Sequence, residues 1–239
     1  MIYGSSLSPQ VISRLREEGI SLKLESCGAL TIYQREGGFP GGPLRKVVAA
    51  PREGGFSIYP VHSTQPEVST NLLLRLSSPV VVAPRSTVEV YVRVPISAGV
   101  YVLNGGAQVL IDSFSRHPYK YALYGPAASG VVCRFYRTDA YLQVPEGELW
   151  SAVTKLVIEN DSDSFREVRN VVLPALNTMV YVDGRGAAYV EAVRLRISRD
   201  GLGDVSLENR PPLEGLRECP QQFGRLQERA IKFLMEFGL

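Results

Sequence analysis

Residues that bind metals or form disulfides are scarce in this sequence of 239 residues. There are two histidines, His62 and His117, and three cysteines, Cys27, Cys133 and Cys219, without any Cys-x-x-Cys pair. Zinc sites and disulfide frameworks need closely spaced ligands or paired cysteines, so neither is expected here. We predict free, buried thiols, no metal site and no cofactor.

Long apolar runs are also absent. The longest one, around Pro79 to Pro84, is far shorter than the ~20 residues that a membrane-spanning helix needs. The first residues, MIYGSSLSPQ, lack the charged and apolar regions of a signal peptide. We therefore expect a cytoplasmic protein without a membrane span.

Neither sign of charge is in excess. The chain has 26 basic and 24 acidic side chains, which gives a formal net charge of +2. A dedicated nucleic-acid-binding domain usually has a pI above about 9 and a basic stripe, so nucleic acid is not expected as a partner, although a local basic patch can still form. Most of the positive charge is carried by arginine, which suits planar, bidentate ion pairs better than lysine does.

Standard nucleotide-binding and catalytic motifs are missing. The segment GPAASG at 125–130 has the glycines of a phosphate-binding loop, but it lacks the Lys-Ser/Thr pair of that loop. The nucleophile motif G-x-S-x-G does not occur either. These absences favour a protein that is not an enzyme. Paired carboxylates on separate strands, as in sandwich-type glycosidases, leave an enzyme as an open alternative.

The dominant pattern is the alternation of apolar and polar residues. From Thr87 to Val94 every second residue is valine, and the residues between them are mostly polar. Such alternation with β-branched side chains predicts a half-buried strand, and Ala192 to Ile197 repeats it. The other predicted strands are 21–26, 29–34, 44–50, 57–61, 99–103, 107–114, 120–124, 130–136, 150–159, 167–173 and 179–182.

No helix is predicted between these strands. Because parallel strands need long return connections, we expect antiparallel pairing throughout. The fold class is therefore mainly β, with antiparallel β-sandwich packing. We expect a larger sandwich domain at 1–145 and a smaller immunoglobulin-like unit at 146–215, in which residues 155–174 form a hairpin. One continuous sandwich or an open barrel is the alternative.

One short helix is predicted at each end of the chain. Near the N-terminus, Ser8 fits the N-cap, Pro9 the first helical position and Gly19 the position after the end. At the C-terminus, an amphipathic helix is expected over 220–238. Its apolar stripe either packs on the protein's own sheet or binds a partner. The residues of this candidate partner helix are Phe223, Leu226, Leu234 and Phe237.

The segment 112–137 has the highest density of side chains typical of binding sites. If its two strands pair across the turn 125–130, Lys120, Tyr124, Arg134 and Tyr136 come close together. Arginine with tyrosine is typical of protein interfaces and anion pockets, but also of a half-exposed sheet face in which the rings shield the strands. The candidate ligand- or partner-binding residues are Asp112, Arg116, His117, Lys120, Tyr121, Tyr124, Arg134 and Tyr136.

Four short strings carry a resemblance to a known family. KYALYG (120–125), GVVCRFY (130–136), VIEN (157–160) and VVLP (171–174) resemble an uncharacterised archaeal family, a domain of unknown function, over most of the chain. The resemblance implies no activity, cofactor or substrate. It does imply an archaeal cytoplasm, and it implies that the KYALYG and CRFY strands define the family.

Two functions from different classes follow. The first is a non-enzymatic binding or scaffold module that presents the Arg/Tyr-rich face or the C-terminal helix to a protein partner or to a second copy of the chain. The second is an enzyme or small-ligand binder for an anionic or carbohydrate ligand, with its site around 112–137. Only the second predicts a concave pocket with convergent polar groups.

Overall fold

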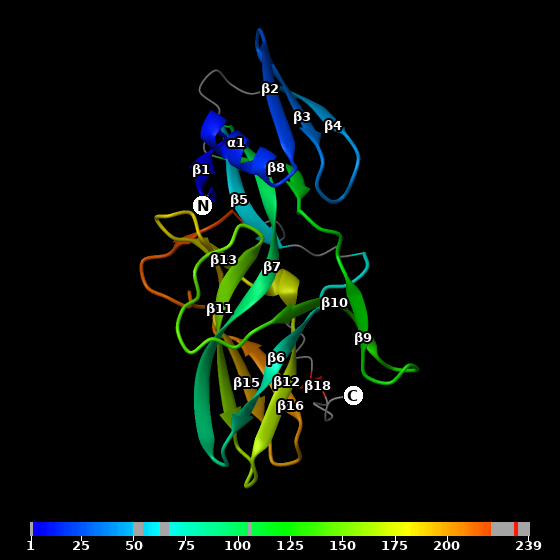
Figure 1. The fold of residues 1–239 in the computed structure, drawn as a ribbon, viewed down its shortest axis with the longest axis vertical. Coiled ribbons are helices and arrows are strands. Elements are labelled where there is room, and N and C mark those ends of the chain that lie inside the picture. The colour runs from blue at the N-terminus through cyan, green and yellow to red at the C-terminus, as the bar shows by residue number, and fades with distance from the viewer. Residues whose placement is uncertain (1, 50–54, 63–66, 105–106, 221–231, 234–239) are drawn as a thin grey trace.

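The computed structural model describes residues 2–49, 55–62, 67–104, 107–220 and 232–233. Within them lie one α-helix, α1 (Pro9–Glu17), and one 3-10 helix, η1 (Ala175–Asn177). The molecule is elongated, with α1 and a small sheet at one end and the hairpins of two larger sheets at the other (Figure 1). None of the helices in the described part has both the length and the apolar composition needed to cross a bilayer.

The largest sheet has eleven strands and is built around β7 (Ser86–Asn104), a strand of 19 residues. The sequence predicted two strands here, which are in fact continuous. The first half of β7 pairs with β11, and the second half pairs with β5 and β8. The other strands of this sheet are β1 (Ser5–Ser6), β5 (Phe56–His62), β8 (Ala107–Phe114), β11 (Ser151–Asn160), β13 (Val180–Val182), β14 (Ala188–Val190), β15 (Val193–Ile197), β16 (Gly203–Leu207), β17 (Arg217–Glu218) and β18 (Lys232–Phe233).

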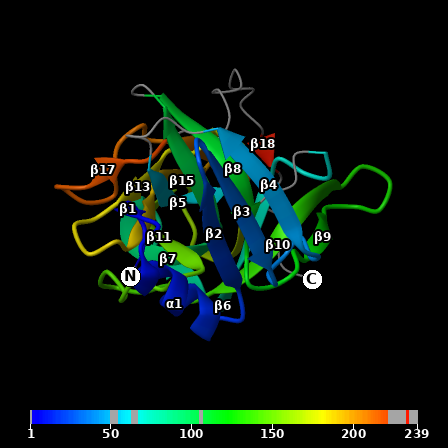
Figure 2. The ribbon, with the colours of Figure 1, turned by 90° about the horizontal axis from the view of Figure 1, so that it is seen from above.

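Two smaller sheets complete the fold. The second sheet has the order β12-β6-β10-β9, and the third has the order β2-β3-β4 (Figures 1 and 2). Alternate residues of the first two sheets meet in one hydrophobic core, for example Val92 of β7, Leu74 of β6 and Ile158 of β11. The bounds are β2 (Ser21–Cys27), β3 (Leu30–Glu36), β4 (Leu44–Ala49), β6 (Leu72–Val82), β9 (Tyr121–Tyr124), β10 (Val131–Thr138) and β12 (Arg166–Leu173).

The expectation of antiparallel pairing throughout is wrong at three places. Strand β10 runs parallel to β6, and β11 runs parallel to β14 and β15. Parallel neighbours need a long connection, which is usually a helix. In this fold the long connection between β11 and β15 is made of other strands, including β12 of the second sheet.

The predicted hairpin at 155–174 is also wrong, although its turn is correct. Asn160 accepts hydrogen bonds from the backbone N–H and the hydroxyl of Ser162 (3.0 and 2.7 Å), which is the expected Asx turn. The turn leads from β11 in the largest sheet to β12 in the second. Strand β11 pairs with β7, and β12 pairs with β6.

The N-terminal helix has the predicted ends. The Ser8 side chain accepts a hydrogen bond from the Val11 N–H, Pro9 is the first helical residue, and Gly19 has a positive φ of 82°. Val11 and Leu15 are buried, so the helix packs on the core with one face.

The predicted C-terminal helix falls mostly on residues outside the described part of the chain, including Phe223, Leu226, Leu234 and Phe237. At its three described positions no helix is found: Pro220 lies outside any helix or strand, and Lys232 and Phe233 form β18, which pairs with Gly203 and Asp204 of β16. A sheet edge offers unpaired backbone groups, and pairing with them competes with an isolated amphipathic helix.

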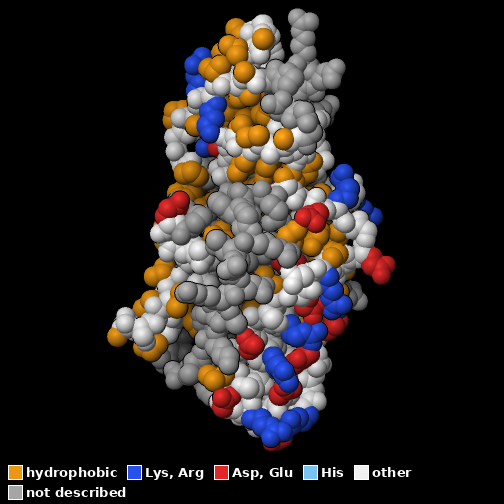
Figure 3. All heavy atoms as spheres, turned by 180° about the vertical axis from the view of Figure 1, so that it is seen from behind, with side chains coloured by type: hydrophobic (Ala, Val, Ile, Leu, Met, Phe, Trp, Pro, Cys, Tyr) orange, Lys and Arg blue, Asp and Glu red, His pale blue; other side chains and the backbone are white. Residues whose placement is uncertain are grey.

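Ion pairs cover the outer face at one end of the largest sheet. Arg194 of β15 bonds to Glu159 of β11 and to Glu208, and Arg196 bonds to Asp161. Figure 3 shows acidic and basic side chains side by side at this end. Arg194 and Arg196 are thus used in ion pairs within the fold, which need no ligand.

Candidate functional site

The β9–β10 hairpin carries four of the predicted site residues, Tyr121, Tyr124, Arg134 and Tyr136. Tyr121 lies opposite Arg134, and Tyr124 lies opposite Val131, so the strands pair across the turn as predicted. Gly125 adopts a positive φ of 98°, and the Gly130 N–H donates to the Pro126 carbonyl at 2.6 Å, which closes the turn. Strand β10 also pairs with β6, which fixes the direction in which its side chains point.

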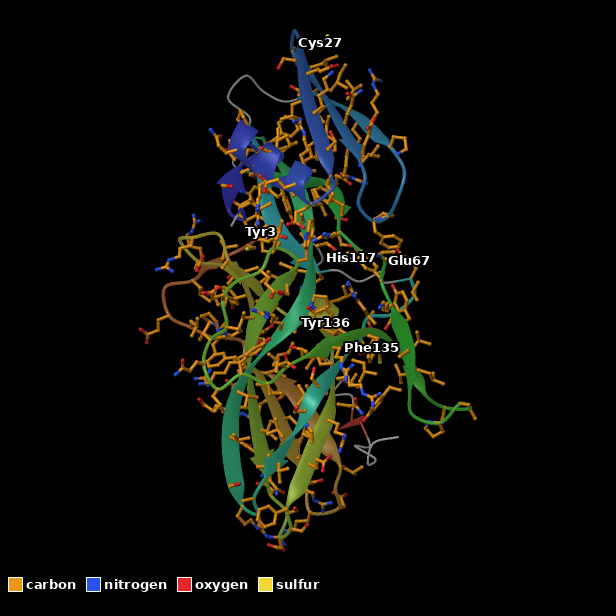
Figure 4. All side chains as sticks on the ribbon, in the orientation of Figure 1. Tyr3, Cys27, Glu67, His117, Phe135 and Tyr136 are labelled. Atoms are coloured by element: carbon orange, nitrogen blue, oxygen red, sulfur yellow. The ribbon has the colours of Figure 1, made fainter. Side chains whose placement is uncertain are left out.

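A cleft of about 740 Å³ lies between β10, the end of β8 and the middle of β7. His117, Phe135 and Tyr136 gather there, between β7 and the β9–β10 hairpin (Figure 4). Five of the eight predicted residues line it, namely Arg116, His117, Lys120, Arg134 and Tyr136. The other lining residues are Pro95, Ile96, Ser115, Pro118, Phe135, Arg137, Glu148 and Trp150.

Arg134 is the most unusual side chain of the cleft. It is only 7% exposed, and neither Nε nor Nη1 has a hydrogen-bond partner among the described residues. Its guanidinium carbon lies 4.1 Å from the centre of the Tyr119 ring. Burial lowers the pKa of Arg134 to about 10, which still leaves the group charged at neutral pH. The site therefore holds a buried cation whose Nε and Nη1 lack acceptors among the described residues.

Tyr119 holds this guanidinium in place. Its hydroxyl is 2.9 Å from the hydroxyl of Ser97 on β7, and its ring meets the ring of Phe39 edge-on at 4.9 Å. The cation–π contact with this ring gives no hydrogen-bond acceptor to Nε or Nη1 of Arg134.

Positive charge exceeds negative charge around the cleft. The four cationic lining residues are Arg116, Lys120, Arg134 and Arg137, and the one carboxylate among the lining residues is Glu148. Glu148 forms an ion pair with Arg93 at 2.9 Å, so it is already neutralised from outside the cleft.

Arg116 also has an acidic partner. Its Nη1 donates to Glu18 at 2.8 Å, and the same carboxylate oxygen accepts the indole N–H of Trp150 at 3.2 Å. No ion pair involving Lys120, Arg134 or Arg137 is found within the described residues. Three cations of the cleft are thus left for an anion.

Asp112, by contrast, does not line the cleft. Its Oδ2 accepts hydrogen bonds from the Tyr33 hydroxyl and from Arg35 Nε, both at 2.7 Å. The side chains of this ion pair are 4% and 6% exposed, and together they join β3 to β8. Burial beside Asp112 raises the pKa of Tyr33. The geometry is that of a satisfied structural pair.

A second, much smaller cavity of about 20 Å³ is lined by Arg134 and His62. The His62 Nε2 is 2.7 Å from the Thr178 carbonyl oxygen. Burial lowers the pKa of His62 to about 4, so the ring is neutral at physiological pH and does not compete for anions.

The sequence analysis missed two lining residues that matter for the chemistry. Glu148 ends a segment interpreted as a domain boundary, Trp150 begins a predicted strand, and no pattern at either residue indicated a site. Tyr121 and Tyr124 are on β9 but not among the lining residues.

The three cysteines are free, as predicted. Cys133 and Cys219 are buried, but Cys27 is exposed, because it ends β2 at the tip of the β2–β3 hairpin (Figure 4). In the described ranges, no three His, Cys, Asp or Glu side chains form a group that could hold a metal ion.

Comparison with known proteins gives a family but no activity. The family model described as "Protein of unknown function (DUF432)" matches residues 2–236, so the chain belongs to this family. No curated protein and no solved structure matches the chain. Any function must therefore be inferred from the cleft itself.

Proposed function

We propose that this protein is a binding module that holds an anionic ligand in the cleft beside Arg134. The observation that carries the proposal is the pair of guanidinium nitrogens, Nε and Nη1, which are buried without an acceptor among the described residues. A buried donor without a partner costs about 1–3 kcal/mol, and more when it is charged. An anion that accepts these hydrogen bonds recovers that free energy on binding.

The rest of the lining supports the same ligand. Lys120 and Arg137 add positive charge without an ion pair in the described part of the chain, and the walls are apolar or aromatic. Ligand sites commonly combine an apolar lining with a few convergent polar groups. A neutral carbohydrate fits less well, because Glu148, the one carboxylate of the lining, is already paired with Arg93.

The proposal can be tested with inorganic pyrophosphate as the probe. Trp150 is the single tryptophan of the chain and lines the cleft, so its fluorescence reports on occupancy directly. We expect a saturable change that weakens as salt is added. Calorimetry on the same samples detects binding that leaves the fluorescence unchanged.

Two variants that each remove one positive charge distinguish binding in the cleft from a general effect of the protein's charge. Arg134→Met should weaken pyrophosphate binding at least about 10-fold, because charged hydrogen bonds are lost. Arg196→Met removes the same charge at an exposed ion pair outside the cleft and should bind like the wild type. Equal affinity of Arg134→Met and wild type would contradict the proposal.

A protein partner is the second candidate function. Leu123, Val131 and Val132 are exposed on the β9–β10 hairpin, and β9 is the last strand in the described order of its sheet. Exposed apolar residues beside a sheet edge are typical of pairing with another chain. We expect self-association that Leu123→Lys abolishes, measured by sedimentation velocity over a range of concentrations.

An archaeal source and a cytoplasmic location remain expectations from the sequence.

A further inference from the structure

The cleft is too large for a small inorganic anion alone. Its volume of about 740 Å³ falls within the roughly 300–1,000 Å³ typical of sites for drug-sized organic molecules. An anion bound to Arg134 occupies only one part of this space. The remaining lining residues therefore carry information about the rest of the ligand.

The uncompensated charges indicate how many negative charges the ligand carries. Lys120, Arg134 and Arg137 have no ion pair within the described residues, whereas Arg116 is paired with Glu18. One carboxylate neutralises a single cation. A diphosphate or triphosphate group offers several charged oxygens and matches three cations better, and arginine and lysine are the usual side chains for binding phosphate.

The aromatic wall indicates the other end of the ligand. Phe135, Tyr136 and Trp150 line the cleft together with Pro95 and Pro118. Burial raises the pKa of Tyr136, so its ring remains neutral and apolar at physiological pH. Flat rings stack on such side chains with little dependence on ring identity.

We propose that the ligand is a nucleotide-type molecule, in which a polyphosphate group binds Arg134, Lys120 and Arg137 and a flat ring lies against Tyr136 and Trp150. This inference rests on the anion-binding function proposed above. The missing phosphate-binding loop does not oppose it, because that loop acts through backbone N–H groups at a helix start. Here side-chain cations on a sheet and its loops take that role.

The test compares three probes by isothermal titration calorimetry, since adenine absorbs where Trp150 is excited. Adenosine diphosphate has both the ring and the polyphosphate, methyl diphosphate has only the polyphosphate, and adenosine has only the nucleoside. We expect adenosine diphosphate to bind at least about 10-fold more tightly than methyl diphosphate, which is within the range of one stacked base. Adenosine alone should bind more weakly than either.

Variants locate each part of the ligand. Tyr136→Phe keeps a ring and should keep the preference for adenosine diphosphate, whereas Tyr136→Leu should reduce it. Lys120→Met should weaken both diphosphates equally and leave their ratio unchanged. The comparison of probes on the wild-type protein stands even if a Tyr136 variant does not fold.

The outcomes separate this inference from the function on which it rests. If both diphosphates bind with equal affinity, the ring inference is wrong and the anion-binding function stands. If neither diphosphate binds, and pyrophosphate does not bind either, both are wrong. If adenosine binds as tightly as adenosine diphosphate, the polyphosphate assignment is overturned.

Discussion

Replacing Arg134 by methionine should stabilise the protein, which is the reverse of what removing a buried, well-bonded side chain does. The two guanidinium nitrogens without partners cost about 1–3 kcal/mol each by the usual penalty for a buried unsatisfied donor. The contact with the Tyr119 ring at 4.1 Å returns about 0.5–2 kcal/mol. The balance favours methionine, whose flexible apolar side chain fills the same space.

We expect a gain of about 2 kcal/mol in the free energy of unfolding of Arg134→Met, a value below the midpoint of this balance. For a protein of this size the gain corresponds to a rise in Tm of about 4–8 °C. The assay is urea and thermal unfolding in a buffer free of phosphate and sulfate. Added pyrophosphate should then raise the stability of the wild type but not that of Arg134→Met.

A neighbouring arginine provides the control. The Arg93 Nε is also buried without a partner, but Nη1 and Nη2 donate to the Tyr141 hydroxyl and the Glu146 carbonyl, both at 2.9 Å, and the side chain pairs with Glu148. Arg93→Met should therefore destabilise the protein. If Arg134→Met also lowers the stability, by more than about 1 kcal/mol, the guanidinium serves the fold and the reasoning above is refuted.

Three further predictions concern the fold. Burial lowers the pKa of His62 to about 4. Between about pH 6.5 and pH 4 the unfolded chain therefore binds a proton that the folded protein does not, and the free energy of unfolding decreases as the pH is lowered through this window. His62→Gln should reduce this fall in urea titrations, by up to about 3 kcal/mol, and an unchanged profile would argue against it. Asp112→Ala should cost about 3–5 kcal/mol because Arg35 is left as a buried charge, and Arg35→Met with Asp112→Leu should cost much less in the same assay. Ser8→Ala should lower the stability by about 1 kcal/mol through loss of the helix cap, measured by thermal unfolding.

Alternation along a strand with one polar face was the clearest signal in the sequence, and one long strand without it was missed. Alternation identified the first half of β7 and β15, because their outward residues are polar. Strand β6 was missed, since Leu72 and Leu74 lie in the main core while Leu73 packs with Cys133 and Val172 on the opposite face. A strand covered on both faces loses its alternation, and its sequence no longer distinguishes it from a buried helix.

Sheet order was beyond the sequence for a different reason. The parallel pairs arise because the chain passes between sheets and returns, as it does from β11 through β12 to β15. Local patterns predict which segments are strands, but the choice of sheet depends on contacts that are distant in the sequence.

The candidate site shows the same division between local and distant contacts. The pairing of β9 with β10 is local, and the density of arginine and tyrosine along 112–137 was sufficient to find Arg134 and Lys120. Asp112 lies outside the cleft, and its partners, Tyr33 and Arg35, are 79 and 77 residues away in the sequence. No pattern near Asp112 signalled that it was already paired.

The central claim is that Arg134 binds an anion in the cleft, and a crystal soaked in tungstate tests it most directly. Tungstate is a tetrahedral oxyanion like phosphate, and its metal atom gives a strong anomalous signal. The account predicts an anomalous peak within hydrogen-bond reach of the Arg134 guanidinium, on the side of Lys120 and Arg137. Tungstate bound only at other sites, with this cleft open to solvent in the crystal, would contradict the account.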